Sequence, residues 1–229
     1  MHARRWLFPG LVVALLTPGL ANAQSSIQDF KLGGSARVLS QECIRLTPDQ
    51  PYTSGSAWFN QAIDLKQSFE MRLDVVLGKK DVEGADGIVF VFHPTPQTGF
   101  RGEGMGFAGL VPSVGIELDT YQNFHLDDPF LDHVALMSNG ESFHGGGSGT
   151  PPVEVGNLED GQRHPLRITW KPGGKLQVYL DNKLRAAYSA EAVMRTFGGQ
   201  STVYWGMTAA TGRLSNAQDV CIEKLFIGV

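Results

Sequence analysis

The chain is poor in basic clusters, in cysteine and in long apolar runs. It has 229 residues, and 19 Lys and Arg against 23 Asp and Glu give a formal net charge of −4 at pH 7. Outside the N-terminal segment the only adjacent basic pair is Lys79-Lys80. A protein that binds a nucleic-acid duplex needs a concentrated basic face that neutralises phosphates. We therefore expect no nucleic-acid partner.

Long apolar runs are confined to the N-terminus. Residues 7–20 are mostly apolar but contain two prolines, and they follow two arginines and precede Ala21-Asn22-Ala23. This pattern predicts a cleaved export signal over residues 1–23, because a membrane span needs roughly 20 uninterrupted apolar residues. No later segment is long and apolar enough to cross a membrane. Residues 24–229 are then a single domain of a secreted or periplasmic protein.

The two cysteines, Cys43 and Cys221, lie near opposite ends of this expected domain. Export would place them in an oxidising compartment, where cysteines on different strands of one sheet can reach disulfide distance. The alternative is two buried thiols on strands that are not neighbours. These residues alone leave both possibilities open.

Several enzyme signatures are also missing. The glycine-rich stretch 99–107 is not followed by Lys-Ser/Thr, so it is not a phosphate-binding loop. No G-x-S-x-G nucleophile motif is present, and Ser148 lies in a glycine run that we expect to be a flexible loop. Four histidines show no metal-ligand spacing and are expected at the surface or in hydrogen bonds: His93, His125, His144 and His164.

Short β-rich runs occur along the whole chain, separated by clusters of Gly, Pro, Asn and Asp. This arrangement predicts an all-β antiparallel sandwich in one domain. The stretch Lys171-Pro172-Gly173-Gly174 predicts a hairpin, and only residues 190–197 are predicted to be helical. The predicted strands are 36–39, 43–46, 57–59, 69–77, 87–92, 113–121, 133–137, 166–170, 176–180, 203–207 and 220–227.

Carboxylates cluster between residues 117 and 133. Apolar residues alternate with Glu117, Asp119 and Tyr121, which predicts that these three share one face of a strand. Two carboxylates spaced in this way lie about 7 Å apart and repel each other unless a cation binds. Oxygen donors suit Ca²⁺, and an added imidazole suits Mn²⁺ or another transition ion, so the cluster could hold both. The alternative is a solvated acidic strand edge. The candidate ligands are Glu117, Asp119, Tyr121, Asn123, Asp128 and His133.

The order Glu-x-Asp-x-Tyr-x-Asn, followed by Asp-Pro and then His, resembles the metal-binding motif of the L-type lectins, meaning the legume lectins and their bacterial relatives. The resemblance extends from about residue 30 to residue 229. It implies a concanavalin-like antiparallel β-sandwich, or jelly roll. It implies that Glu117 and His133 bind the transition metal. Asp119 and Asp128 would bind both ions, and the Tyr121 carbonyl and Asn123 would bind Ca²⁺.

Three further features belong to the same resemblance. Gly140 stands where plant members have a serine that supports the water on the transition metal. Residues 54–59 resemble an early strand of the family, in which we expect Trp58 to be a core residue rather than a sugar platform. Pairing of Cys43 with Cys221 is favoured, because the first and last strands of the family are neighbours.

Three loops resemble the sugar site of the family. In Ala85-Asp86-Gly87 the family places a sugar-binding Asp after a cis peptide bond, and Asp86 matches it. The glycine-rich loop implies a backbone N–H donor, and the loop after residue 210 resembles one that sets monosaccharide preference. Asp86 would accept from two sugar hydroxyls, while Tyr121 or Phe124 would pack on the apolar sugar face. The candidate sugar-binding residues are Asp86, Gly102, Glu103, Gly104, Tyr121, Asn123, Gly212, Arg213 and Leu214.

These patterns predict an exported, Ca²⁺-dependent lectin that binds glycans without turnover, and exposed sheet faces leave room for a homo-oligomer. One alternative is a glycoside hydrolase on the same kind of sandwich, which needs two carboxylates about 5 to 9 Å apart. Laminarinase-like enzymes place E-x-D-x-E on one strand, and Tyr121 occupies the third position here. The second catalytic carboxylate is therefore missing. The other alternative is an adhesive or structural module with a degenerate sugar site.

Overall fold

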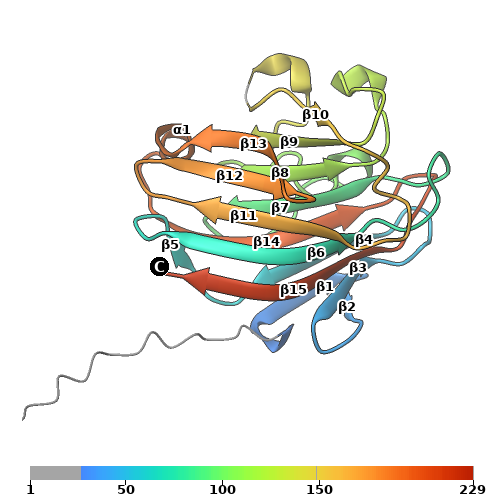
Figure 1. Ribbon diagram of the computed structural model, residues 1–229, viewed down its shortest axis with the longest axis horizontal. Coiled ribbons are helices and arrows are strands. Elements are labelled where there is room, and N and C mark those ends of the chain that lie inside the picture. Colours follow the sequence, from blue (N-terminus) through green and yellow to red (C-terminus); the bar gives the residue numbers. More distant parts are fainter. Residues whose placement is uncertain (1–26, 148, 229) are drawn as a thin grey trace, which may run out of the picture.

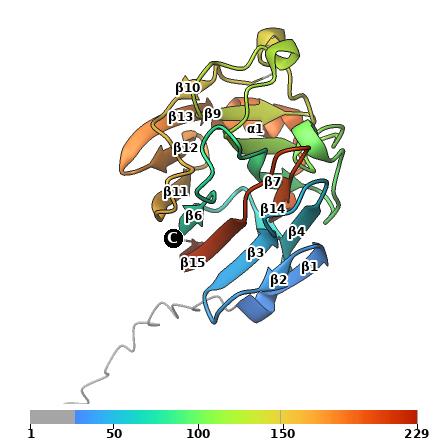
Figure 2. The same cartoon turned by 90° about the vertical axis from the view of Figure 1, so that its right-hand side faces the viewer.

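A computed structural model describes residues 27–147 and 149–228 and shows two antiparallel sheets packed face to face (Figures 1 and 2). The first sheet has the order β1 (Phe30–Gly34), β4 (Ser54–Phe59), β14 (Thr202–Ala210), β7 (Gly87–His93), β8 (Val114–Asp119), β9 (His133–Ser138) and β10 (Val153–Glu154), with β5 (Ile63–Asp64) paired to β14. The second has the order β13 (Lys183–Ser189), β12 (Lys175–Leu180), β11 (His164–Trp170), β6 (Phe69–Val76), β15 (Gln218–Ile227), β3 (Cys43–Thr47) and β2 (Arg37–Val38). The predicted β-sandwich is confirmed.

Apolar side chains from both sheets fill the space between them. In β6 the buried positions alternate with more exposed ones, as expected for a strand with one face on the core. Phe69 of this strand stacks on Phe92 of β7 and on Trp170 of β11, with ring centroids 5.6 and 6.3 Å apart. The indole N–H of Trp170 donates to the carbonyl oxygen of Leu65 at 2.9 Å, so the buried polar atom of this ring is satisfied.

The centre of the first sheet is buried on both faces. All residues of β7 and β8 are buried, because a second apolar cluster covers their outer face. This cluster joins Trp58 to Met105 and Phe107 of the glycine-rich loop and to Leu110, which follows the loop. A Cβ at Gly115 would lie 2.7 Å from the ring of Phe107, so the glycine makes room for that ring. The cluster anchors the glycine-rich loop on the sheet, and Trp58 is a core residue as predicted.

The predicted hairpin is present between β11 and β12, and α1 (Ala190–Thr196) is the only α-helix of the described residues. Strands β1, β5, β10 and β13 were not predicted. β1 contains two glycines, β5 and β10 have two residues each, and β13 is an edge strand whose apolar and polar residues do not alternate regularly. The prediction for the strand 113–121 was too long. β8 ends at Asp119, whose Oδ1 atom accepts a hydrogen bond from the Tyr121 N–H at 2.7 Å and turns the chain. Glu117 and Asp119 share a strand face, but Tyr121 does not.

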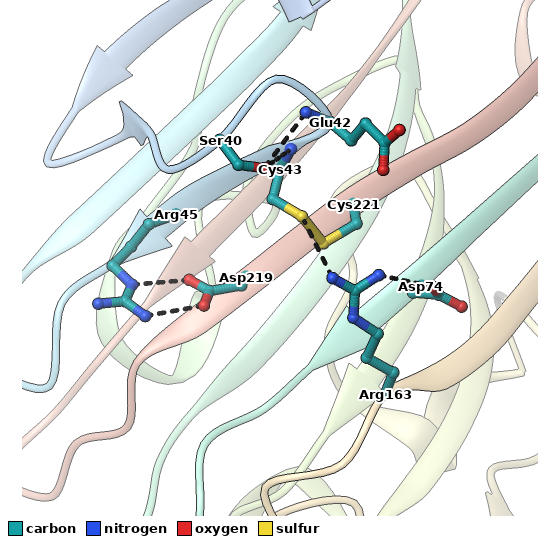
Figure 3. The surroundings of a disulfide bond; sticks show 8 residues. All are labelled: Ser40, Glu42, Cys43, Arg45, Asp74, Arg163, Asp219 and Cys221. Atoms are coloured by element: carbon teal, nitrogen blue, oxygen red, sulfur yellow. Dashed lines mark hydrogen bonds and ion pairs between the residues drawn. A yellow bond between two sulfur atoms is a disulfide. The ribbon is translucent and has the colours of Figure 1, made fainter.

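Cys43 and Cys221 form a disulfide bond between the directly paired strands β3 and β15 (Figure 3). The alternative of two separate thiols is therefore wrong. Beside it, the guanidinium of Arg45 donates two hydrogen bonds, of 2.7 and 2.8 Å, to the carboxylate of Asp219 on the neighbouring strand. The first and last parts of the described chain are thus joined both covalently and by an ion pair.

The predicted export signal, residues 1–23, lies outside the described residues. Among the described residues, no helix has the length and apolar character that crossing a membrane requires.

Candidate functional site

The ends of four neighbouring strands form one row across the first sheet. Ala210 at the end of β14 pairs with Gly87 at the start of β7, which pairs with Asp119 at the end of β8, which in turn pairs with His133 at the start of β9. The loops that leave this row therefore emerge at the same edge of the sheet. They include Asp86, the segment after Ala210 and the long connection between β8 and β9. The register thus gathers most of the predicted site residues in one place.

The metal-ligand candidates lie on the outer face of this sheet. The inward side chains of β8 and β9, such as Leu118 and Val134, belong to the main core, so Glu117, Asp119 and His133 point the other way. Asp128 returns to them through the connecting loop, where its Oδ2 atom accepts a hydrogen bond from the Asn123 N–H at 2.7 Å. Asp119, Asp128 and His133 each offer a ligand atom within 4.8 Å of the other two.

His144 joins this cluster from the loop after β9, contrary to the expectation that it is a surface or merely hydrogen-bonded residue. Its Nε2 atom lies 3.1 Å from Oε2 of Glu117, 3.4 Å from Oδ1 of Asp128 and 3.2 Å from Nε2 of His133. Its side chain is only 4% exposed. Glu117, His133 and His144 form a second group whose ligand atoms all lie within 4.8 Å of one another.

Burial and mutual repulsion govern the charges of these groups. Burial, followed by the charges of Glu117 and Asp128, raises the pKa of Asp119 well above its usual range. Burial also raises the pKa of Asp128. For Glu117 burial acts in the same direction, but the imidazoles of His133 and His144 outweigh it and hold the pKa of this carboxyl below its usual value. Without a cation, Asp119 and Asp128 are therefore driven towards their protonated forms, and only the two imidazoles favour an ionised carboxylate, that of Glu117.

The residues fit the two metal ions that the L-type motif implies. Three of their buried oxygen atoms have no hydrogen-bond partner, namely Oε2 of Glu117, Oδ1 of Asp128 and Oδ1 of Asn123. Unpartnered buried oxygens are costly unless something else engages them, and a cation does so. Carboxylate, amide and carbonyl oxygens suit Ca²⁺, whereas the imidazoles suit a transition ion.

Gly140 does not take part in this cluster. Its φ is +66°, and a Cβ there would lie 2.3 Å from the backbone nitrogen of Leu110. The Gly109 N–H donates to its carbonyl oxygen at 2.9 Å. Gly140 is therefore a turn residue that packs against Gly109 and Leu110, and this packing leaves no room for a serine side chain.

Asp86 is held beside the cluster by a cis peptide bond to Ala85, as the resemblance implies. Its backbone N–H donates to the Ala210 carbonyl oxygen at 3.1 Å, and its own carbonyl oxygen accepts from the Thr120 N–H at 2.9 Å. Asp86 is 4% exposed, and its Oδ2 atom has no hydrogen-bond partner. Burial, and then the nearby carboxylate of Glu103, raise the pKa of Asp86 to about 7.

The glycine-rich loop places Glu103 over the metal-ligand loop. Residues Gly102–Gly104 form the 3-10 turn η2, in which the Gly104 N–H already donates to the Arg101 carbonyl oxygen at 3.4 Å. Oε2 of Glu103 accepts a hydrogen bond from Nδ2 of Asn123 at 3.3 Å and lies 3.1 Å from Nε2 of His125. Glu103 therefore connects the loop of Asn123 to the loop that covers the sheet.

The remaining predicted site residues lie on the loops next to Asp86 in the fold. Gly212 lies against it, since a Cβ at Gly212 would be 3.5 Å from Oδ1 of Asp86. Arg213 follows at an exposed position, and Leu214 is half-buried. Phe124, on the loop of Asn123, is 81% exposed and Tyr121 is 37% exposed, so both residues are accessible to solvent. The structure therefore places all three predicted sugar-site loops at the edge of the sheet that carries the metal-ligand candidates.

A sequence model of the legume lectin β-barrel domain matches residues 21–224. The chain belongs to the L-type lectin family. Its lectin domain is 27% identical over 226 residues to the vesicular integral-membrane protein VIP36 of Canis lupus familiaris, a match that covers 91% of the chain and 59% of VIP36. It is 35% identical over 122 residues to the pesticidal crystal protein Cry22Aa of Bacillus thuringiensis, covering 51% of the chain and 17% of that protein. The chain thus spans less than two thirds of each of these relatives.

Solved lectin structures share the fold of this lectin domain. The basic winged bean lectin with Tn-antigen superposes with a TM-score of 0.69 at 22% identity, covering 85% of this chain and 90% of that one. The exoplasmic/lumenal domain of VIP36 in its Ca²⁺/Man3GlcNAc-bound form gives a TM-score of 0.68 at 23% identity, covering 87% and 86%. The predicted L-type resemblance and the concanavalin-like sandwich are confirmed.

The L-type motif does not reveal His144. This residue follows His133 by eleven positions and lies in the loop after β9. Neither a strand nor a helix brings residues with this spacing into contact. The only available signal was a histidine in the loop directly after the strand that begins with His133.

Proposed function

We propose that this L-type lectin domain is an exported, Ca²⁺-dependent carbohydrate-binding protein that holds glycans without turning them over. The observation that carries the proposal is Asp86, a buried carboxylate with an unpartnered oxygen at the edge where the metal-ligand loop and the two other loops meet. A buried acceptor without a partner is costly in the free protein, and sugar hydroxyls would satisfy it.

The metal ligands would hold the loop that positions Asp86. In the proposed assignment, Ca²⁺ is held by Asp119, Asp128, Asn123 and the Tyr121 carbonyl, and its chemistry is to neutralise and order their oxygens. The loop after β8 also anchors Asp86, because the Thr120 N–H and hydroxyl both donate to the Asp86 carbonyl oxygen, at 2.9 and 3.2 Å. Loss of Ca²⁺ should therefore loosen the position of Asp86.

The other proposed contacts follow from the position of each loop. Asn123 and the backbone N–H of Gly102 or Glu103 are proposed as donors to sugar hydroxyls, and Gly104 is the least available of the three loop amides. Gly212, Arg213 and Leu214 would border the site on the other side of Asp86. The exposed rings of Tyr121 and Phe124 would pack on the apolar face of a sugar.

The names of the relatives support a binder over an enzyme. VIP36 was solved in Ca²⁺/mannose and Ca²⁺/Man3GlcNAc-bound forms, and a Bauhinia forficata lectin was solved in complex with GalNAc. The buried carboxylates Glu117 and Asp119 are 1% and 2% exposed, which leaves them poorly placed as the acid and nucleophile of a glycosidase. The disulfide supports export to an oxidising compartment.

A glycan array probed with and without a chelator tests the proposal. We expect retention of at least one glycan class in Ca²⁺, loss of retention after chelation, recovery when Ca²⁺ is restored, and no released product. Retention that is insensitive to chelation would contradict the metal dependence. Release of a shortened sugar would favour the glycosidase, and no retention at all would favour the adhesive or structural alternative.

A further inference from the structure

His144 is a cluster residue that the L-type motif does not assign. Three atoms crowd its Nε2 atom at 3.1 to 3.4 Å, and they come from Glu117, Asp128 and His133. A single imidazole N–H can donate to only one of them. Oε2 of Glu117 and Oδ1 of Asp128 are nevertheless buried without a hydrogen-bond partner. Well-formed hydrogen bonds within the group therefore leave two buried oxygens unsatisfied.

A metal ion explains the same distances. Neighbouring ligand atoms that bind one metal ion at about 2.0 to 2.2 Å lie roughly 3 to 3.6 Å from one another. The separations here are 3.1, 3.2 and 3.4 Å from Nε2 of His144, and 3.6 Å between Nε2 of His133 and Oε2 of Glu117. The two imidazole rings are nearly perpendicular, with an interplanar angle of 85°, and their Nε2 atoms lie 3.2 Å apart, so the rings meet at these nitrogens and do not stack.

The loop after β9 is built to deliver this imidazole. The chain turns at Gly140, and the Phe143 N–H then donates to the Glu141 side chain at 3.1 Å before the 3-10 turn η4 (His144–Gly146). A Cβ at Gly145 would lie 2.6 Å from the ring of Phe143, so glycine is needed for this packing. The Thr150 N–H returns the chain to β9 by donating to the Leu136 carbonyl oxygen at 2.8 Å.

We propose that His144 is a protein ligand of the transition-metal ion. Its imidazole, the second in the site beside that of His133, makes the site select a Zn²⁺-like ion over Mn²⁺. This inference rests on the proposed metal-dependent lectin function. Imidazole ligands suit Zn²⁺, Cu²⁺ and Ni²⁺, whereas Mn²⁺ suits carboxylate, carbonyl and water ligands. Replacing a solvent ligand with the His144 ring therefore shifts the preference of the site towards the later metals of the first row.

The test uses the whole protein, stripped of metal and then saturated with Ca²⁺. Zn²⁺ and Mn²⁺ are titrated by calorimetry into the wild type, into His144→Gln and into the matched control His164→Gln. His164 lies on β11 in the other sheet, where it contacts Asp160 and Asp181. We expect the wild type to prefer Zn²⁺, and His144→Gln to lose at least about tenfold in Zn²⁺ affinity with a smaller change for Mn²⁺. His164→Gln should match the wild type.

A second measurement needs no variant. In the Co²⁺-loaded wild type, each coordinated imidazole contributes one exchangeable, strongly shifted N–H resonance to the NMR spectrum, so we expect two such resonances. One resonance, or an unchanged Zn²⁺ affinity in a folded His144→Gln, would overturn the proposal. Glycan retention in Ca²⁺ is measured on the same samples. If the wild type retains glycan but these results are negative, only the proposed role of His144 is rejected. If the wild type does not retain glycan, the proposed lectin function is rejected.

Discussion

Gly212 lies directly against Asp86, and a Cβ at position 212 would be 3.5 Å from Oδ1 and 3.7 Å from Oδ2 of that carboxylate. The two residues are far apart in sequence but meet because Ala210 at the end of β14 pairs with Gly87 at the start of β7. The contact is of ordinary van der Waals length, so a small side chain at Gly212 would fit but would reach towards the carboxylate.

Gly212→Leu should therefore cover Asp86 and weaken glycan binding while the fold remains intact. Gly212 does not require a left-handed backbone, so we expect the melting temperature to change little. Gly156→Leu is the matched control, since a Cβ at this exposed glycine meets no atom within 4 Å. Equal glycan affinity in Gly212→Leu and Gly156→Leu would show that the loop after β14 does not border the sugar.

Removal of metal should destabilise the protein. Ca²⁺ that binds only the folded chain adds about 2.7 kcal/mol at a free concentration one hundred times its Kd. We expect chelation to lower the melting temperature and Ca²⁺ to restore it. Asp119→Ala should reduce this response more than Glu117→Ala, because Asp119 is proposed to bind both ions. A melting temperature that does not respond to chelator, in protein without bound metal by elemental analysis, would remove the proposed site.

Loss of the disulfide should lower stability without changing the fold. Cys43 and Cys221 are separated by 178 positions in the sequence, and the chain-entropy model gives on the order of 4 to 5 kcal/mol as an upper guide for so long a loop. The strands that carry them are already paired, so the double variant Cys43→Ser/Cys221→Ser should still fold. Urea unfolding measures the effect. An unchanged midpoint, with two free thiols confirmed by mass, would contradict this account.

Glu159 should make the protein less stable as the pH rises. Burial is the main cause that raises the pKa of Glu159 from 4.5 to about 8, and the side chain accepts a hydrogen bond from Asn216. Between these two values the folded chain binds more protons than the unfolded chain, so the free energy of unfolding falls with increasing pH. Glu159→Gln keeps the acceptor and removes the charge.

We therefore expect Glu159→Gln to raise the melting temperature relative to wild type at pH 8.5, with little gain at pH 4.5. The linked free energy is at most a few kcal/mol. Glu191→Gln, at an 84% exposed side chain of α1, is the control and should show no such dependence. A constant difference across this pH range would mean that Glu159 is ionised in the folded protein.

Most of the fold could be predicted from the sequence because its signals are local. Alternation in β6 and β11 and the Lys171-Pro172-Gly173-Gly174 turn each reflect strand or turn chemistry within a few residues. Strand β13 was missed because its place in the sheet depends on pairing with β12, and its apolar and polar residues do not alternate regularly. The end of β8 depended on one side-chain hydrogen bond, from the Tyr121 N–H to Asp119.

The site was predictable where a motif names its residues in order, and unpredictable where loops meet. Glu117, Asp119 and His133 come together because they lie on adjacent strands, so the motif and the register agree. The approach of His144 depends on how the loop after β9 folds back, which no periodic pattern encodes. Likewise, the contact between Gly212 and Asp86 follows from the pairing of β14 with β7.

The most direct test of the proposed lectin function is the glycan affinity of Asp86→Ala, with Ca²⁺ titrated in parallel. The proposed hydrogen bonds to this carboxylate contribute roughly 1.5 to 3 kcal/mol each, so losing two of them means about a hundredfold or greater loss of affinity. The control is Asp64→Ala on β5, which pairs with the opposite end of β14. The glycan is one that the wild type retains on the array.

We predict that Asp86→Ala binds this glycan at least about a hundredfold more weakly while it still folds and binds Ca²⁺, and that Asp64→Ala matches the wild type. Loss of both Ca²⁺ and glycan binding in Asp86→Ala would show that Asp86 acts through the metal loop. Undiminished glycan affinity in Asp86→Ala would contradict the proposed sugar site.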